Sequence, residues 1–238
     1  MTETLAALLL AHVLADFVFQ TNWMVANKQR PTALALHGAI VLATAVAATG
    51  TVDPGLLWLT ALHIAIDAIK VRARQGLLAF LIDQAAHLAT IAALALWRPT
   101  LWSDGLWSSQ TALMLVTPGP IRATRAGGFA VGHLMQPFAA RLPADITAES
   151  LPGAGRVIGL LERGLIFTFI LLGQPGAVGL LIAAKSILRF GAVKDDRALS
   201  EYVIIGTLAS FGWALVAGFA TLSGLRFLPP LGILPVTP

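Results

Sequence analysis

Long apolar runs, separated by short polar or charged stretches, make up most of this chain. Each run approaches the roughly 20 residues that an α-helix needs to cross the hydrocarbon core of a bilayer. The pattern therefore predicts an all-α fold, a polytopic integral membrane bundle of about seven or eight transmembrane helices. The expected spans cover residues 3–23, 31–50, 56–69, 77–97, 121–142, 157–172, 177–190 and 202–222.

The fifth of these runs is the least regular, because a Pro-Gly-Pro sequence precedes it and basic residues interrupt it. We expect a kinked span there, with a half-span followed by an interfacial helix as the alternative. The chain then divides into four predicted parts. These are a four-helix bundle with a polar core (1–98), an irregular, kinked or interfacial segment (99–155), a three-span C-terminal part (156–224) and a Pro-rich tail (225–238).

Composition strengthens the membrane assignment. The chain is 57% hydrophobic and 12% charged, with a mean hydropathy of +0.79, whereas soluble domains carry about 25% charged residues. The net charge of +4 does not indicate a nucleic-acid partner, because the basic residues form short clusters between apolar runs. The chain has no cysteine, which excludes a thiolate metal site.

The basic clusters also predict an orientation. The stretches after the first and third runs hold Lys28, Arg30, Lys70, Arg72 and Arg74, whereas those after the second and sixth runs hold no basic residue. Cytoplasmic loops carry an excess of lysine and arginine. We therefore expect the N-terminus to lie outside the cytoplasm.

The first run carries three polar side chains at helical spacing, His12, Asp16 and Gln20. On an α-helix, residues four apart lie on one face. Ionisable side chains inside a membrane cost about 2.5–3.5 kcal/mol each on insertion scales. A stripe of such residues therefore indicates a functional site.

Two further runs repeat the pairing of a histidine with a carboxylate four residues away, His63 with Asp67 and His87 with Asp83. A helical rise of about 1.5 Å per residue places most of these groups in one layer, in the cytoplasmic half of the membrane. His37 of the second run adds an imidazole at a similar depth. We expect the first four spans to converge on one polar cavity.

Imidazole and carboxylate groups are ligands for zinc, and also for manganese or iron. A divalent metal would also offset the charge of buried carboxylates. The same residues could instead relay protons or ions, or form a hydrogen-bond network that only fixes helix packing. The metal site is the interpretation adopted here, and its expected ligands are His12, Asp16, His63, Asp67, Asp83 and His87.

Other polar residues are assigned supporting roles. Gln20 and Gln84 are expected to hydrogen-bond within the site or to the substrate rather than to bind metal. Lys70 can bind an anion, pair with Asp67 or extend to the inner interface. The expected catalytic residues are Asp16, Asp67, Lys70 and Asp83.

The C-terminal half carries its own charges inside apolar runs. Glu162 and Arg163 are expected to form structural ion pairs, with Glu162 pairing to Lys185 or Arg189 and tying helices together. Lys185 and Arg189 could alternatively hold a phosphate headgroup near the inner leaflet.

These motifs resemble a family of bacterial membrane proteins, the domain of unknown function 3307. The resemblance covers the chain from about Leu8 to Gly218 and implies a multi-pass protein of the bacterial inner membrane, without a nameable activity. It rests on His12-x-x-x-Asp16-Phe17-x-x-Gln20, His63-x-x-x-Asp67-x-x-Lys70 and Asp83-Gln84-x-x-His87, with Leu161-Glu162-Arg163 and the stretch 184–190 resembling the extension of longer members.

The functional expectation is a metal-dependent membrane enzyme. It would be a hydrolase or transferase that acts on an inner-leaflet lipid or an isoprenoid phosphate at a cytoplasm-facing site. The alternatives are a proton-coupled transporter or ion channel that uses the same residues as a relay, and a non-catalytic membrane subunit. Membrane lipid is the expected partner, and an oligomer or a partner subunit is left open.

Overall fold

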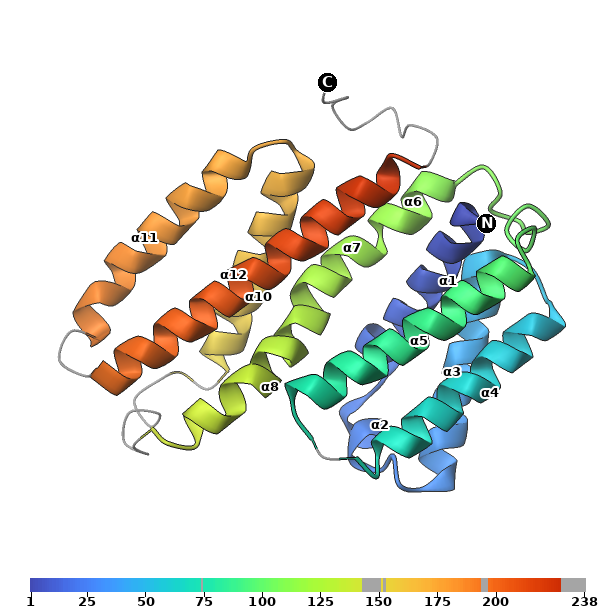
Figure 1. Cartoon of the computed structure of the whole chain (residues 1–238), viewed down its shortest axis with the longest axis horizontal. Coiled ribbons are helices and arrows are strands. Elements are labelled where there is room, and N and C mark those ends of the chain that lie inside the picture. The colour runs from blue at the N-terminus through green and yellow to red at the C-terminus, as the bar shows by residue number, and fades with distance from the viewer. Residues whose placement is uncertain (74, 143–150, 152, 194–196, 228–238) are drawn as a thin grey trace. The chain divides into compact units, whose positions relative to one another are not determined.

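A computed structural model describes residues 1–73, 75–142, 151, 153–193 and 197–227 (Figure 1). All regular structure in these residues is helical. The chain forms two compact units. The N-terminal unit comprises residues up to Ile121 together with the end of the last helix from Ser223, and the C-terminal unit comprises Arg122–Leu222.

The N-terminal unit begins with a helix that changes type part-way. Asp53 caps the helix Pro54–Lys70 by accepting a hydrogen bond from the backbone N–H of Gly55 at 2.7 Å. The helix Pro31–Thr49 ends at Gly50, whose φ of 68° lies in the left-handed region that favours glycine. The elements are α1 (Thr2–Leu14), the π-helical turn η1 (Ala15–Phe19), α2 (Asn22–Ala26), α3 (Pro31–Thr49), α4 (Pro54–Lys70), α5 (Leu77–Trp97), α6 (Thr111–Val116) and α7 (Pro118–Ile121).

The long helices of this unit pack around α1, which contacts α3, α5 and α6, while α4 contacts both α3 and α5. Their common core is an apolar cluster that includes the fully buried Leu8, Leu56 and Ile91. This packing fixes the facing sides of α1, α3, α4 and α5, which carry the polar residues predicted from the sequence.

The C-terminal unit contains the π-helical turn η2 (Arg122–Ala126), α8 (Gly127–Ala139), α10 (Ala154–Leu171), α11 (Pro175–Val193) and α12 (Arg197–Leu225) up to Leu222. Its apolar core joins α10, α11 and α12 through Ile166, Val178 and Phe211.

Among the described residues, four helices are long and apolar enough to cross a membrane, and they cover Thr2–Phe19, Pro31–Thr49, Leu77–Trp97 and Arg197–Leu225. Many large apolar side chains on these helices are exposed, such as Leu78 at 71%, Leu208 at 66% and Val216 at 70%. This is the surface expected of helices that face lipid rather than water. The prediction of a helical membrane protein is confirmed at this level.

The run predicted as a kinked fifth span (121–142) is helical up to Ala139, and helical structure also precedes it from Thr111, but this stretch is not one α-helix. Thr117 separates α6 from α7, and the π-helical turn η2 follows before α8. Pro118 accounts for the first break, since proline cannot donate a backbone hydrogen bond to the preceding turn. The end of the predicted irregular segment (99–155) and most of the predicted Pro-rich tail (225–238) fall on residues 143–150, 152 and 228–238, outside the described part.

Candidate metal site in the N-terminal unit

The N-terminal unit gathers the predicted histidines and aspartates into one buried group, here called the polar cluster. None of their side chains is more than 8% exposed. The polar cluster consists of His12 from α1, Asp16 from η1, His37 from α3, His63 and Asp67 from α4, and Asp83 and His87 from α5.

The π-helical turn η1 changes the predicted stripe of His12, Asp16 and Gln20. His12 Nδ1 and Asp16 Oδ2 lie 3.7 Å apart, as the spacing predicts. Gln20, however, has left the helix, with φ −70° and ψ 110°. The prediction that the α-helical stripe continues to Gln20 is therefore wrong. The π-helical turn, with hydrogen bonds from i to i+5, is wider than an α-helical turn, and the helix ends before Gln20. Turns of this kind often occur at functional sites.

Three atoms that could bind a metal, each from a different element, form a compact triangle. His37 Nε2 and His63 Nε2 lie 3.1 Å apart, and Asp16 Oδ1 lies 3.3 Å from the first and 3.2 Å from the second. Asp67 Oδ2 approaches the same place, 3.3 Å from His37 Nε2 and 3.9 Å from His63 Nε2. Asp16 Oδ1 nevertheless accepts no hydrogen bond.

A second convergence lies beside the first. His87 Nε2 is 3.5 Å from Asp83 Oδ1 and 4.0 Å from Asp67 Oδ1. Both ring nitrogens of His87 and the Oδ1 atom of Asp83 are buried and have no hydrogen-bond partner. Buried His/Asp groups that could hold a metal are thus present, each with ligand atoms within 4.8 Å of one another: His12, His63 and His87; Asp16, His37 and His63; and Asp67, Asp83 and His87.

Two lysines close the carboxylate side of the polar cluster. Lys28 donates to Asp67 Oδ1 at 2.8 Å, and Lys70 donates to Asp83 Oδ2 at 2.5 Å. The predicted options for Lys70 were pairing with Asp67, anion binding or extension to the interface, so its ion pair with Asp83 on α5 is a correction. The contact of Lys28 with Asp67 was not predicted, because Lys28 was considered only as one of the basic residues that indicate membrane orientation.

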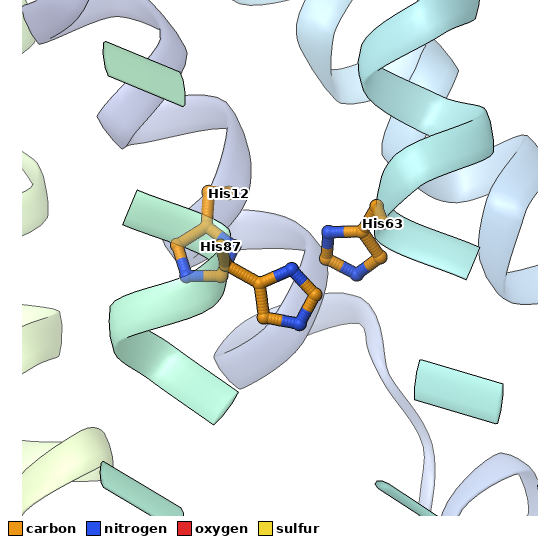
Figure 2. Close-up of side chains that lie close together, drawn as sticks. All are labelled: His12, His63 and His87. Carbon is orange, nitrogen blue, oxygen red and sulfur yellow. The ribbon is translucent and has the colours of Figure 1, made fainter. Parts of the chain in front are cut away.

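The three imidazoles of His12, His63 and His87 meet deeper in the unit (Figure 2). Figure 2 shows the His87 ring between the other two; its centroid lies 4.0 Å from that of His63 and 5.2 Å from that of His12. These rings line a cavity of about 10 Å³ together with apolar residues such as Leu8 and Ile91. That volume is close to the minimum for one water molecule, so the cavity admits a water or an ion but not a larger molecule.

Gln84 acts as a hydrogen-bonding partner, as predicted. Its Oε1 atom lies 3.3 Å from His12 Nε2, and its Nε2 donates to Asp83 Oδ2 at 3.1 Å. The two contacts link α1 to α5 and fix the orientation of one imidazole and one carboxylate. Gln20, the other amide, has a buried Nε2 without a hydrogen-bond partner.

Residues 4–114 match a family described as "Protein of unknown function (DUF3307)". The N-terminal part of the chain is therefore similar to this family. The predicted resemblance is confirmed for these residues, and the whole polar cluster lies within them. The match ends before the C-terminal unit, and comparisons with curated proteins and with solved structures found no match.

Beyond the DUF3307 region, the C-terminal unit holds a separate group of buried charges. Lys185 donates to Glu162 Oε2 at 2.7 Å and lies 5.2 Å from the centre of the Phe211 ring, so the predicted pairing of Glu162 with Lys185 is confirmed. Arg163 points elsewhere, because successive helical residues are rotated by about 100°. It donates to the Thr124 carbonyl and to Ser210 Oγ, each at 3.1 Å.

Two predicted roles in this unit need restating. A direct ion pair between Glu162 and Arg163 is not among the ion pairs of the described residues, where Glu162 pairs with Lys185 instead. The ammonium of Lys185 is therefore already neutralised by a carboxylate, which leaves its proposed anion-binding role without a free charge. The Arg189 side chain lies outside the described part of the structure.

Proposed function

We propose that the polar cluster binds a divalent metal and that the protein is a metal-dependent membrane enzyme. The enzyme is a hydrolase or transferase that acts on an inner-leaflet lipid or an isoprenoid phosphate. The observation that carries the proposal is the triangle of His37 Nε2, His63 Nε2 and Asp16 Oδ1, with edges of 3.1, 3.3 and 3.2 Å.

These edges have the size of one face of a metal-ligand tetrahedron. Metal–ligand bonds of about 2.0–2.1 Å, as zinc makes with nitrogen and oxygen, imply ligand-to-ligand edges of roughly 3.3–3.4 Å. Asp67 Oδ2 is placed to supply the fourth ligand, 3.3 Å from His37 Nε2. Two imidazoles and two carboxylates favour zinc, with manganese or iron as the alternatives.

A network that served packing alone would account less well for the same contacts. Buried polar atoms without a partner cost about 1–3 kcal/mol each. The polar cluster contains several of them, including Asp16 Oδ1, Asp67 Oδ2 and Asp83 Oδ1. A metal would satisfy carboxylate oxygens and imidazole lone pairs together, and would offset carboxylate charge that the two lysines only partly neutralise.

The residues around the site divide the chemistry between them. A divalent metal there would polarise a phosphoryl oxygen and make water a better nucleophile. Asp83 is the carboxylate outside the first ligand set, so it would take a proton from the attacking water and return that proton to the leaving alcohol as the ester P–O bond breaks. Lys70 pairs with Asp83, and its side chain, 27% exposed, adds positive charge on the accessible side of the site.

The proposal places this site in the cytoplasmic half of the bacterial inner membrane, with about seven or eight spans and the N-terminus outside. The absence of cysteine makes the topology directly testable. Single cysteines at Arg72 and at Val52 are expected to react with a membrane-impermeant maleimide from opposite sides. Labelling of both from the same side would contradict the proposed orientation.

Metal content tests the central claim. The purified full-length protein, equilibrated with zinc and dialysed, is expected to retain at least one equivalent, and Asp16→Asn and His37→Ala are expected to lose it. His133→Ala is the matched control, because His133 is the only histidine outside the polar cluster. A wild-type protein that retains no zinc, manganese or iron would overturn the proposal.

One observation favours the alternative of proton-coupled transport. Ionisable groups follow one another within 4 Å from Lys70 through Asp83 and His87 to Asp67, and from there to His37. Such a chain can pass protons. Proton flux in liposomes that Asp67→Asn abolishes would support transport, and a metal-loaded protein without flux under any gradient would exclude it.

A further inference from the structure

The two carboxylate oxygens of Asp67 face different groups of donors. Oδ2 lies 3.3 Å from His37 Nε2, on the side of the first metal site. Oδ1 accepts a hydrogen bond from Lys28 at 2.8 Å and lies 4.0 Å from His87 Nε2, on the side of Asp83. A carboxylate placed in this way can bind two cations at once, one through each oxygen.

The second side has the features of a metal site in its own right. His87 is 1% exposed and Asp83 3%, and His87 Nε2 lies 3.5 Å from Asp83 Oδ1. Neither of these two atoms makes a hydrogen bond. Lys70 holds only the other oxygen of Asp83, which leaves Oδ1 directed at the imidazole.

We propose that Asp67, Asp83 and His87 bind a second divalent ion, and that Asp67 bridges it to the ion held by Asp16, His37 and His63. The inference rests on the proposed function, since it adds a second ion to the same site. It also changes the role of Asp83, which becomes a ligand rather than a free base.

A pair of divalent ions bridged by one carboxylate is suited to bind a phosphate. Pairs of divalent ions roughly 3.5–4 Å apart clamp the oxygens of a phosphoryl group in phosphatases and nucleases. With two ions, the positive charges of the site, including Lys28 and Lys70, would outnumber the negative charges of its carboxylates, which favours binding of an anion such as phosphate. The cavity of about 10 Å³ beside the imidazoles is too small for it, which leaves the lysine side as its place.

Metal stoichiometry separates one ion from two. In equilibrium dialysis of the full chain against Zn²⁺, wild type is expected to bind two equivalents and His87→Ala one, with His133→Ala as the two-equivalent control. Asp83→Asn combined with Lys70→Met is also expected to bind one, and this pair avoids leaving an unpaired ammonium. Thermal unfolding in the same detergent shows that each variant is folded.

The outcomes distinguish the two proposals. Wild type with no bound metal overturns the proposed function, whereas wild type with one equivalent that the Asp83 and His87 variants keep overturns only the second ion. With Mn²⁺, a bridged pair is expected to give an exchange-coupled magnetic resonance spectrum. Inorganic phosphate is expected to bind wild type at least tenfold more tightly than His87→Ala, and equal binding would contradict the phosphate assignment.

Discussion

The two units solve the problem of buried charge in opposite ways. In the C-terminal unit, Glu162 pairs with Lys185, and Arg163 donates to Thr124 and Ser210. In the N-terminal unit, imidazole nitrogens and carboxylate oxygens converge at distances of 3.1–3.3 Å, and several of them have no hydrogen-bond partner. Charged groups with complete ion pairs and hydrogen bonds hold helices together without a bound ligand. A set of converging lone pairs is instead stabilised when a cation binds.

The comparison predicts different consequences for the same kind of mutation. Removing a residue from the polar cluster should change metal binding, because its side chains supply the proposed metal ligands. Removing a residue from the C-terminal group should change stability and leave metal binding intact. Four substitutions test this distinction, from the largest expected effect to the smallest.

His63→Ala is expected to have the largest effect. His63 belongs to two of the candidate donor groups, whereas His12 belongs to one. Metal affinity should fall by more than about 100-fold, beyond the 10–100-fold typical of residues that only support a ligand. Competition with a zinc-chelating dye measures the affinity, and an equal loss in His12→Ala would show that His63 has no special place.

Glu162→Ala should destabilise the C-terminal unit by about 2 kcal/mol. The substitution leaves the Lys185 ammonium, which is 17% exposed, without its carboxylate, and breaking a fully buried pair costs about 3–5 kcal/mol. Adding Lys185→Met should restore part of the loss. Glu201→Ala is the control, because Glu201 and Arg197 are 60% and 92% exposed, and thermal unfolding in detergent provides the measurement.

Arg163→Met should cost slightly less, about 1.5 kcal/mol, since two hydrogen bonds to the guanidinium are lost while the aliphatic volume is kept. The zinc content should not change. The exposed Arg156 offers a matched variant, Arg156→Met, with no expected loss. A fall in zinc content for Arg163→Met would mean that the two polar groups do not act separately.

Gln84→Ala is expected to have the smallest effect, a loss of about tenfold in metal affinity with the same stoichiometry. Gln84 contacts His12 and Asp83 but supplies no metal-binding atom of its own in the proposal. Isothermal titration measures both quantities, and a loss of a whole equivalent would promote Gln84 to a ligand.

The sequence identifies the residues of the site better than their partners. The pairs at four-residue spacing do lie close together, at 3.7 Å for His12 and Asp16 and 3.5 Å for Asp83 and His87, because helical geometry determines such contacts. The expected ligand set left out His37, although its position inside an apolar run was a usable signal. Its contacts with Asp16 and His63 are between different helices, and no local spacing encodes them.

The lysines show the same limit. Lys70 lies one turn from Asp67 on α4, yet it forms its ion pair with Asp83 on α5. Asp67 instead pairs with Lys28, which lies in the segment between α2 and α3. The packing of the helices against one another determines which lysine pairs with which aspartate. The π-helical turn η1 was also beyond prediction, since its five residues have the same apolar pattern as an α-helix.

The length of α4 has a consequence for the surrounding lipid. In the proposed topology, in which α4 crosses the membrane, its 17 residues reach only about 25 Å at 1.5 Å per residue, whereas the hydrocarbon core is about 30 Å thick. Hydrophobic mismatch of this sign is relieved by local thinning of the bilayer. Thinning would draw headgroups inward around Lys70, so that a lipid phosphate need not leave its leaflet to reach the site.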